Sequence, residues 1–76
     1  MFDRIVSNPA ILGGKPTIRG TRISVAMILE WVASGATRDD ILRKHAHLVA
    51  EDVEQALDYA AASVRNEILV SAEVPH

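Results

Sequence analysis

The chain has 76 residues and a mass of 8.3 kDa, which leaves room for one small domain. Hydrophobic residues make up 49% of the sequence but aromatic residues only 4%, so we expect a small, aliphatic core. The sequence contains no cysteine, which excludes a disulfide-stabilised scaffold, a thiol nucleophile and thiolate metal sites. Because it has neither a long apolar run nor the layout of a signal peptide, we expect a cytoplasmic protein without membrane contact.

The net charge of −2 conceals an uneven distribution. Residues 1–22 carry four cationic side chains and one acidic side chain, whereas residues 23–76 carry four cationic and nine acidic ones. The chain therefore has a basic head and an acidic body. The alternative interpretation is chance scatter in a small sample.

Residues 1–23 are predicted to form an arm of short strands and tight turns. Three of the four glycines and two of the three prolines lie here, and at that density they exclude a helix. We expect a hairpin turn at Gly13 and Gly14, since glycine adopts the positive φ that such a turn requires. The candidate strands are the short β-branched pieces at residues 5–6, 11–12, 17–18 and 21–23.

The first helix is predicted to follow Ser24, a favourable N-cap residue, and to end at Gly35. Met27 and Trp31 form one apolar row along it, and we expect them to pack in the core or against a second subunit rather than to form a platform for a ligand. The other apolar row comprises Val25, Ile28, Leu29 and Val32.

A short second helix is predicted over about residues 38–45. Thr37 precedes it, and Asp40 lies three residues further on, which is the spacing of a capping box. We expect this helix to offer Ile41 and Leu42 to the core.

A third and longest helix is predicted over about residues 50–68, after a turn through residues 46–49. Glu51 and Asp52 lie in its first turn, where the helix dipole favours acidic side chains. Its apolar stripe comprises Val53, Ala56, Leu57, Ala60, Val64 and Ile68.

The order of these elements predicts a mainly α fold, a three-helix helix-turn-helix domain preceded by a short β-hairpin-like arm. The chain divides into the arm over residues 1–23, the bundle over residues 24–68 and a tail over residues 69–76, all within one domain. The tail shows no helical spacing, so we expect it to fray or to wait for a partner.

The glycine-rich run at residues 13–23, GGKPTIRGTRI, resembles the hallmark of the domain-of-unknown-function family 433 (DUF433). The resemblance covers about residues 4–62. Ala46 and Val49 depart from it, because family members tend to have proline and threonine there, so the third helix lacks its usual threonine cap. The other matching residues are Ile5, Asn8, Pro9, Ile11, Gly35, Ile41, Leu48, Glu51, Asp52, Val53, Ala56, Leu57, Tyr59 and Ala60.

This resemblance implies a function. Family members are regarded as prokaryotic helix-turn-helix proteins, often VapB-like antitoxins encoded beside a PIN-like toxin. It therefore implies a type II antitoxin that binds a PIN-like toxin and operator DNA. The alternative is a protein-interaction module that does not bind DNA.

Six cationic side chains are candidate nucleic-acid contacts. In the arm, glycine allows the backbone to approach a phosphate closely, and the cations neutralise its charge. In the alternative interpretation the glycines only form turns, and the basic side chains are solvated or pair with the acidic helices. The spacing of Gly14 and Lys15 does not fit a nucleotide-binding P-loop. The six candidates are Lys15, Arg19, Arg22, Arg38, Arg43 and Lys44.

The third helix would enter the DNA major groove in a standard helix-turn-helix complex. It opens with Glu51, Asp52 and Glu54, whose carboxylates repel phosphates. This acidic start favours a protein partner with a basic groove over readout of bases. If DNA is bound, we expect the arm and the cations of the second helix to contact it.

We expect no catalytic, cofactor or metal site. His45 and His47 are two residues apart, which places them on different faces of a helix, and nothing nearby completes a metal site. Ser24 with either histidine would need a third orienting group and a pocket, which a domain this small rarely encloses. The sequence therefore predicts a binding protein and not an enzyme.

Homodimerisation is also predicted, because the attainable core is small and strands this short are unstable alone. Met27 and Trp31 are candidate dimer contacts. Ile68, Leu69 and Val70 are apolar for a tail, so we expect them to dock as an extended segment on a toxin or on the second subunit.

Overall fold

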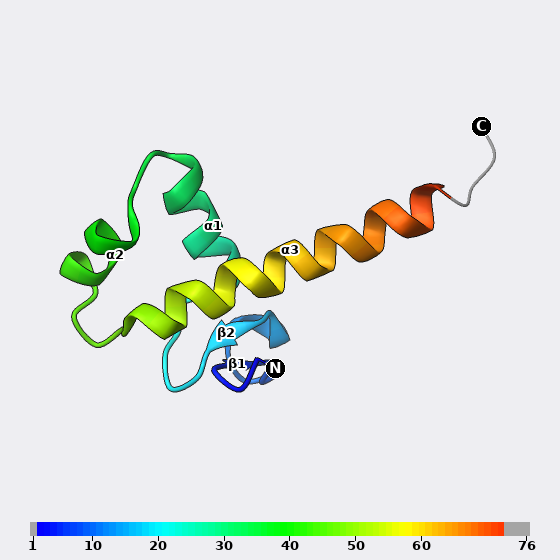
Figure 1. The fold of residues 1–76 in the computed structure, drawn as a ribbon. Coiled ribbons are helices and arrows are strands. Elements are labelled where there is room, and N and C mark those ends of the chain that lie inside the picture. Colours follow the sequence, from blue (N-terminus) through cyan, green and yellow to red (C-terminus); the bar gives the residue numbers. More distant parts are fainter. Residues whose placement is uncertain (1, 73–76) are drawn as a thin grey trace.

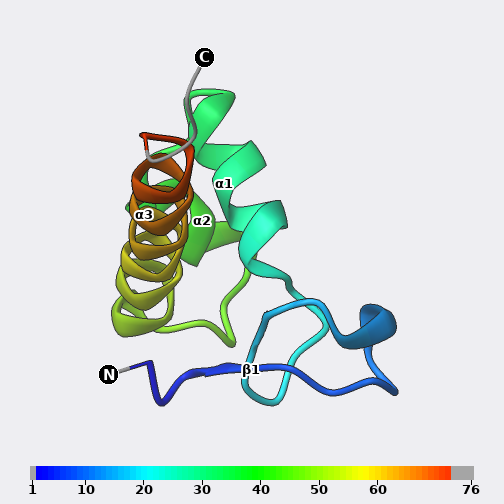
Figure 2. The same ribbon diagram turned by 90° about the vertical axis from the view of Figure 1, so that its right-hand side faces the viewer.

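The computed structural model describes residues 2–72, with side chains as far as residue 65. A two-stranded arm precedes three helices, so the predicted fold class is confirmed. Figure 1 shows the last helix crossing the whole molecule, and Figure 2 shows the arm lying across the base of the helical part. The elements are β1 (Ile5–Val6), the 3-10 turn η1 (Leu12–Gly14), β2 (Thr17–Ile18), α1 (Val25–Ala33), α2 (Arg38–Lys44) and α3 (Ala50–Ala72).

The arm is a small antiparallel sheet. Ile5 of β1 lies opposite Ile18 of β2. Thr17 forms a further antiparallel bridge with Ser24, immediately before α1, and the Ile18 N–H donates to the Ile23 carbonyl. The segment that leads into α1 therefore lies beside β2, which couples the arm to the first helix.

Two of the predicted strands, at residues 11–12 and 21–23, are wrong. Leu12, Gly13 and Gly14 have φ values of 51°, 65° and 87°, so the chain coils into a 3-10 turn instead of extending. Gly20, with φ of 78°, turns the chain between β2 and the segment before α1. Gly13 and Gly14 have the positive φ that the sequence predicted, and Leu12, which is not a glycine, also has a positive φ.

The core is aliphatic, as the composition predicted, and is built from every element except η1. Ile18, Ile28, Val53 and Ala56 are fully buried where the arm, α1 and α3 meet. Burial of such side chains is the main favourable term in a domain of this size. The remaining buried hydrophobic residues are Ile23, Val25, Ile41 and Leu48.

The apolar rows of α1 are divided differently from the prediction. Val25 and Ile28 are buried, but Leu29 and Val32 are 38% and 37% exposed. Trp31 is half-buried and packs against the core cluster. Val25, Ile28 and Trp31 thus face inward, because α3 lies along that side of α1. Leu29 and Val32, one position further on, lie at the surface.

The helix ends follow the predicted caps. The Ser24 hydroxyl accepts from the Met27 N–H at 3.0 Å, and the Thr37 hydroxyl accepts from the Asp40 N–H at 3.1 Å. Gly35, with φ of 102°, follows the Ser34 cap of α1.

The end of α3 differs from the prediction. The helix continues to Ala72, about one turn beyond Ile68, so residues 69–72 are helical and not an extended tail. Residues 73–76 of the predicted tail lie outside the described part of the chain. Within residues 2–72, no helix combines the length and the apolar character that crossing a membrane requires.

Candidate functional site

A buried carboxylate fastens the arm to the first turn of α3. Asp52 is only 1% exposed, and its Oδ1 accepts a hydrogen bond from Nε of Arg4. Its Oδ2 accepts from the Val49 N–H at 2.9 Å. The Arg4 N–H donates to Oε1 of Gln55 at 2.9 Å, and the Gln55 amide donates to Oδ1 of Asp3 at 2.8 Å. Side-chain and backbone bonds together hold the arm in place.

These contacts shift the titration of the paired groups. The carboxylate of Asp52 raises the pKa of Arg4, first by the hydrogen bond and then by its charge. The hydrogen bond from Gln55 is the largest cause that lowers the pKa of Asp3. The sequence did not predict the latch, the contact between Arg4 and Asp52, because it assigned Asp52 to the helix dipole and to an acidic surface. An acidic residue at the third position of a helix signals the capping bond of Asp52 to the Val49 N–H, but no local pattern signals its partner Arg4.

The structure separates the three cationic candidates of the arm. Nε and Nη2 of Arg19 donate to the carbonyl oxygen of Asp3 at 3.0 and 2.7 Å, so this guanidinium closes the arm. Arg22 is exposed in the turn after β2, and Lys15 is exposed directly after η1, before β2. Arg19 therefore has a structural contact, whereas Lys15 and Arg22 remain exposed cations.

The cationic candidates of α2 lie at its two ends. Arg38, at the start, donates from Nη1 to Oε2 of Glu54 on α3 at 2.5 Å. Arg43, near the end, pairs with Asp40, and Lys44 is exposed beside it. Arg38 and Arg43 thus form ion pairs within the chain, whereas Lys44 forms none among the described residues.

Asp40 also accepts from the backbone N–H of Thr37 at 2.8 Å. The hydrogen bonds with the Thr37 backbone and hydroxyl lower the pKa of Asp40, and the charge of Arg43 adds to the same effect. The N-terminal end of α2 is therefore stabilised by a carboxylate that remains ionised at neutral pH.

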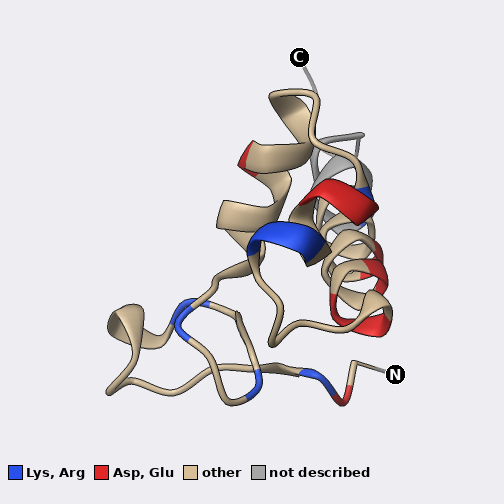
Figure 3. Cartoon of the chain, turned by 90° about the vertical axis from the view of Figure 1, so that its left-hand side faces the viewer, with Lys and Arg blue, Asp and Glu red and all other residues tan. Residues whose placement is uncertain are grey.

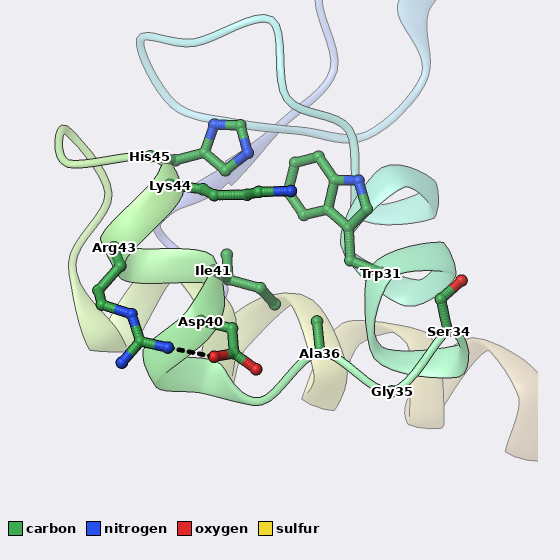
Figure 4. Close-up of a pocket in the computed structure, with 9 residues that line it drawn as sticks. All are labelled: Trp31, Ser34, Gly35, Ala36, Asp40, Ile41, Arg43, Lys44 and His45. Atoms are coloured by element: carbon green, nitrogen blue, oxygen red, sulfur yellow. Dashed lines mark hydrogen bonds and ion pairs between the residues drawn. The ribbon is translucent and has the colours of Figure 1, made fainter.

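Near the turn that joins them, α1 and α2 border a hollow of about 640 Å³ (Figure 4). The Trp31 indole stacks on the His45 imidazole, with ring centroids 4.5 Å apart and planes inclined by 12°. The structure thus brings Trp31, which was predicted to pack in the core or against a second subunit, together with two of the predicted nucleic-acid contacts, Arg43 and Lys44. The lining residues are Trp31, Ser34, Gly35, Ala36, Asp40, Ile41, Arg43, Lys44 and His45.

The surface of α3 is acidic near its start and exposes the apolar side chain of Val64 further along. In Figure 3, acidic residues colour the first turns of this helix, whereas most of the basic residues lie on the arm and α2. Glu51, Glu54 and Asp58 are exposed, and Val64 is 52% exposed. Val64 continues the stripe of which Val53 and Ala56 form the buried start, so the stripe runs past the part of the helix that the core covers.

The candidate partner contacts have different surroundings. Met27 is half-buried, and its sulfur accepts from the Ser24 N–H at 3.5 Å. Trp31 contacts the core and His45 within the chain. The side chains of Ile68, Leu69 and Val70 lie outside the described residues, and only their helical backbone is described.

The two histidines of the α2–α3 turn do not form part of a ligand cluster. The His45 and His47 rings are 6.3 Å apart at nearly a right angle. Among the residues that the structure describes, no group of three or more His, Cys, Asp or Glu side chains is placed to hold a metal ion.

Together, these features define a three-helix domain with a hairpin arm latched onto its last helix. Residues 5–60 match the family described as "Protein of unknown function (DUF433)", and the chain belongs to this family, as its glycine-rich run predicted. The chain is 39% identical over 59 residues to the uncharacterized protein y4eO of Sinorhizobium fredii (strain NBRC 101917 / NGR234). That match covers 78% of this chain and 27% of the relative, so the chain spans about a quarter of that relative's length.

A solved structure has the same fold. The crystal structure of a DUF433 member protein from Anabaena variabilis ATCC 29413 matches with a TM-score of 0.78 at 28% sequence identity. The match covers 93% of this chain and 70% of that chain. It therefore includes the arm as well as the helices.

The fold explains why the glycine-rich run has its composition. Thr17 and Ile18 are fully buried, and Gly20 provides the left-handed turn that follows them. The Thr21 hydroxyl donates to the Ile18 carbonyl at 2.9 Å and accepts from the Ile23 N–H at 3.0 Å. These residues build the turn that joins the arm to α1, so the glycine and hydroxyl positions of the run have structural roles.

Proposed function

We propose that this chain is the antitoxin of a type II toxin–antitoxin pair, which neutralises a PIN-like nuclease by binding it. In this proposal the chain acts in the cytoplasm as a binding protein, with no catalytic step and no cofactor of its own. The family resemblance suggests the class of partner, and the surface of α3 supports it.

The two-part surface of α3 is the observation that carries the proposal. Glu51, Glu54 and Asp58 are exposed along its first half, and of these carboxylates that of Glu54 is paired with Arg38. A nuclease that cleaves RNA holds the phosphates with cationic side chains, so its substrate groove is complementary to an acidic helix. Val64, 52% exposed on the second half, adds an apolar contact of the kind that anchors an interface.

Coexpression tests this function. A PIN-like gene beside the gene for this chain is expected to arrest growth when induced alone, and coexpression of the chain is expected to restore growth. The purified complex is expected to cleave RNA more slowly than the free nuclease. Continued growth arrest with both proteins present, or full nuclease activity in the mixture, overturns the proposal.

Charge reversal on α3 locates the contact. Asp58→Lys is expected to weaken the complex by about tenfold, because a lysine there meets a cationic groove. Glu30→Lys on α1 makes the same charge change at an exposed position away from α3 and serves as the control. Equal weakening by the two variants would show that net charge, and not the α3 surface, governs binding.

Operator DNA is a second candidate partner. Lys15, Arg22 and Lys44 are exposed and make no ion pair among the described residues, which favours contact with phosphates. A dimer would then neutralise about six phosphates, so the log–log salt slope of binding is expected near −5. Replacement of Lys15 and Arg22 by alanine is expected to flatten that slope by about 3 to 4 units. Absence of a gel shift with the upstream region at low salt overturns this candidate.

We also propose that the chain forms a homodimer through the face of α1 that exposes Leu29 and Val32. Apolar side chains gathered on one helix face favour burial against a second copy. Sedimentation equilibrium is expected to give about twice the chain mass of 8.3 kDa, and Leu29→Glu is expected to give the single-chain mass. A wild-type protein at 8.3 kDa throughout contradicts the dimer.

A further inference from the structure

The aromatic wall of the hollow between α1 and α2 consists of Trp31 and His45, and part of the Trp31 ring is not covered by His45. The rings of Trp31 and His45 are nearly parallel, but their centroids are 4.5 Å apart. Parallel rings in van der Waals contact lie about 3.5 Å apart, so the two rings are laterally offset. A five-membered imidazole that is offset from a bicyclic indole covers only part of it. The rest of the indole borders the hollow.

The same hollow has a cationic rim. Lys44 has no ion-pair partner among the described residues, and its side chain extends from α2 toward Trp31 (Figure 4). Arg43 is 74% exposed and pairs through Nη2 with Asp40. The charged side chains of the lining are those of Asp40, Arg43 and Lys44, so their sum is one positive charge. A ligand that fits this rim is an anion.

The remaining lining supplies apolar contact and hydrogen-bond acceptors. Ile41 is 2% exposed and Ala36 is half-buried, so the wall beneath the rim is apolar. At the end of α1 the carbonyls of Glu30, Trp31 and Val32 already accept capping bonds. The hydroxyl oxygen of Ser34, a lining residue, donates to the Glu30 carbonyl and has lone pairs that can accept. A ligand with a planar, N–H-bearing ring and an anionic group matches both features.

We propose that this hollow binds a nucleotide, with the base against the open part of Trp31 and the phosphate held by Lys44 and Arg43. Its volume of about 640 Å³ lies within the range of small-molecule sites. An acidic peptide would use the two cations but would leave the aromatic wall without a planar partner, so the wall favours a base. The ligand is either a free mononucleotide or an unpaired nucleotide of a single strand, since both present the same base and phosphate.

Fluorescence measures binding at this site directly, because Trp31 is the one tryptophan of the chain. With excitation at the red edge of its absorption, a mononucleotide is expected to quench the indole saturably, whereas ribose 5-phosphate is not. A short single strand that binds much more tightly than the mononucleotide identifies nucleic acid as the source. Equal affinity per nucleotide identifies a free mononucleotide.

Four variants test these contacts: two keep the Trp31 fluorophore, and the two at Trp31 are followed with a labelled nucleotide. Lys44→Ala is expected to weaken binding by about fivefold or more, since it removes a charged contact to phosphate. Arg65→Ala removes a cation from the exposed surface of α3 and is expected to leave the affinity unchanged. Trp31→Leu is expected to weaken binding of a labelled nucleotide by about tenfold, and Trp31→Phe is expected to recover part of the loss because it restores a ring. Circular dichroism verifies that each variant is folded.

Several outcomes overturn the nucleotide site. Quenching by ribose 5-phosphate or inorganic phosphate with the same affinity means that only the phosphate is recognised. An acidic peptide that competes equally well means a peptide site. No saturable quenching by either mononucleotide or single strand means no site. The proposal is independent of toxin binding, because Asp58→Lys on α3 is expected to leave nucleotide affinity unchanged.

Discussion

The base of the molecule and its opposite corner use charged residues in different ways. At the base, Arg4 and Arg19 bond to Asp52 and to the Asp3 carbonyl, and the central carboxylate is 1% exposed. At the α1–α2 corner, Lys44 is exposed beside an open aromatic stack. The basic character of the arm is therefore in part structural, and the cation count of a segment does not by itself locate a binding surface.

The contrast extends along single helices. The first half of α3 is covered by the arm and α1 and contributes Val53 and Ala56 to the core, whereas Val64 in the second half is half exposed. On α1, Ile28 is fully buried and its neighbour Leu29 is 38% exposed. Stability and interaction thus reside on different faces of the same helices, and matched substitutions can separate them.

The largest expected effect is at Ile28. Ile28→Ala should destabilise the fold by about 3 kcal/mol, because it leaves a cavity in a closely packed core. Leu29→Ala, one residue away, should cost less than about 1 kcal/mol in the dissociated chain, at protein concentrations too low for the proposed dimer, since that side chain is partly solvated there. Urea denaturation of both variants measures the difference. A similar loss for the two at low concentration would mean that Leu29 belongs to the core of the single chain, whereas a Leu29 effect that appears only at high concentration would support the proposed dimer.

The latch should be next in size. Asp52→Ala removes a buried acceptor of the Val49 N–H and of Arg4, so we expect a loss of about 2 to 3 kcal/mol. Glu51→Ala, at the exposed neighbouring position, should change stability by less than about 0.5 kcal/mol. Thermal melting followed by circular dichroism compares them. If Asp52→Ala melts with the wild type, the latch does not stabilise the arm.

A smaller, opposite effect is expected at the start of α3. Val49 immediately precedes the helix and is 49% exposed, so its methyl groups contribute little burial. Val49→Thr should stabilise the protein by about 0.5 to 1.5 kcal/mol, because a hydroxyl at the N-cap can accept from the Glu51 N–H, whereas the Asp52 N–H already donates to the carbonyl of residue 49. Val49→Ala lacks the hydroxyl and should not give this gain. A melting temperature that is unchanged or lower for the threonine variant contradicts the expectation.

The smallest effect concerns pH. The pKa of Asp40 is lowered in the folded chain, so its ionised form favours folding above its ordinary pKa of 3.8, and this contribution is lost as the pH falls through the lower, folded value. The wild type should therefore lose stability in acid more than Asp40→Asn does. Urea midpoints at neutral pH and below about pH 4 measure this, and the two proteins should become more similar in acid. A constant difference at both pH values would mean that ionisation of Asp40 is not involved.

Capping positions were predictable from the sequence, because capping is local. Ser24 with Met27 and Thr37 with Asp40 lie three residues apart, so their bonds depend only on the start of one helix. The latch between Arg4 and Asp52 joins residues far apart in the chain, and no local pattern encodes that contact.

The sequence by itself determined the class of fold, the number of helices, the aliphatic core and, through its glycine-rich run, the family. These depend on short-range spacing of residue types, which survives without coordinates. Only the tertiary structure decided which of two adjacent apolar residues, Ile28 or Leu29, is buried, and which cations are engaged internally. It also placed Trp31 with Lys44 at one hollow, because where two helices meet depends on the packing of the whole core.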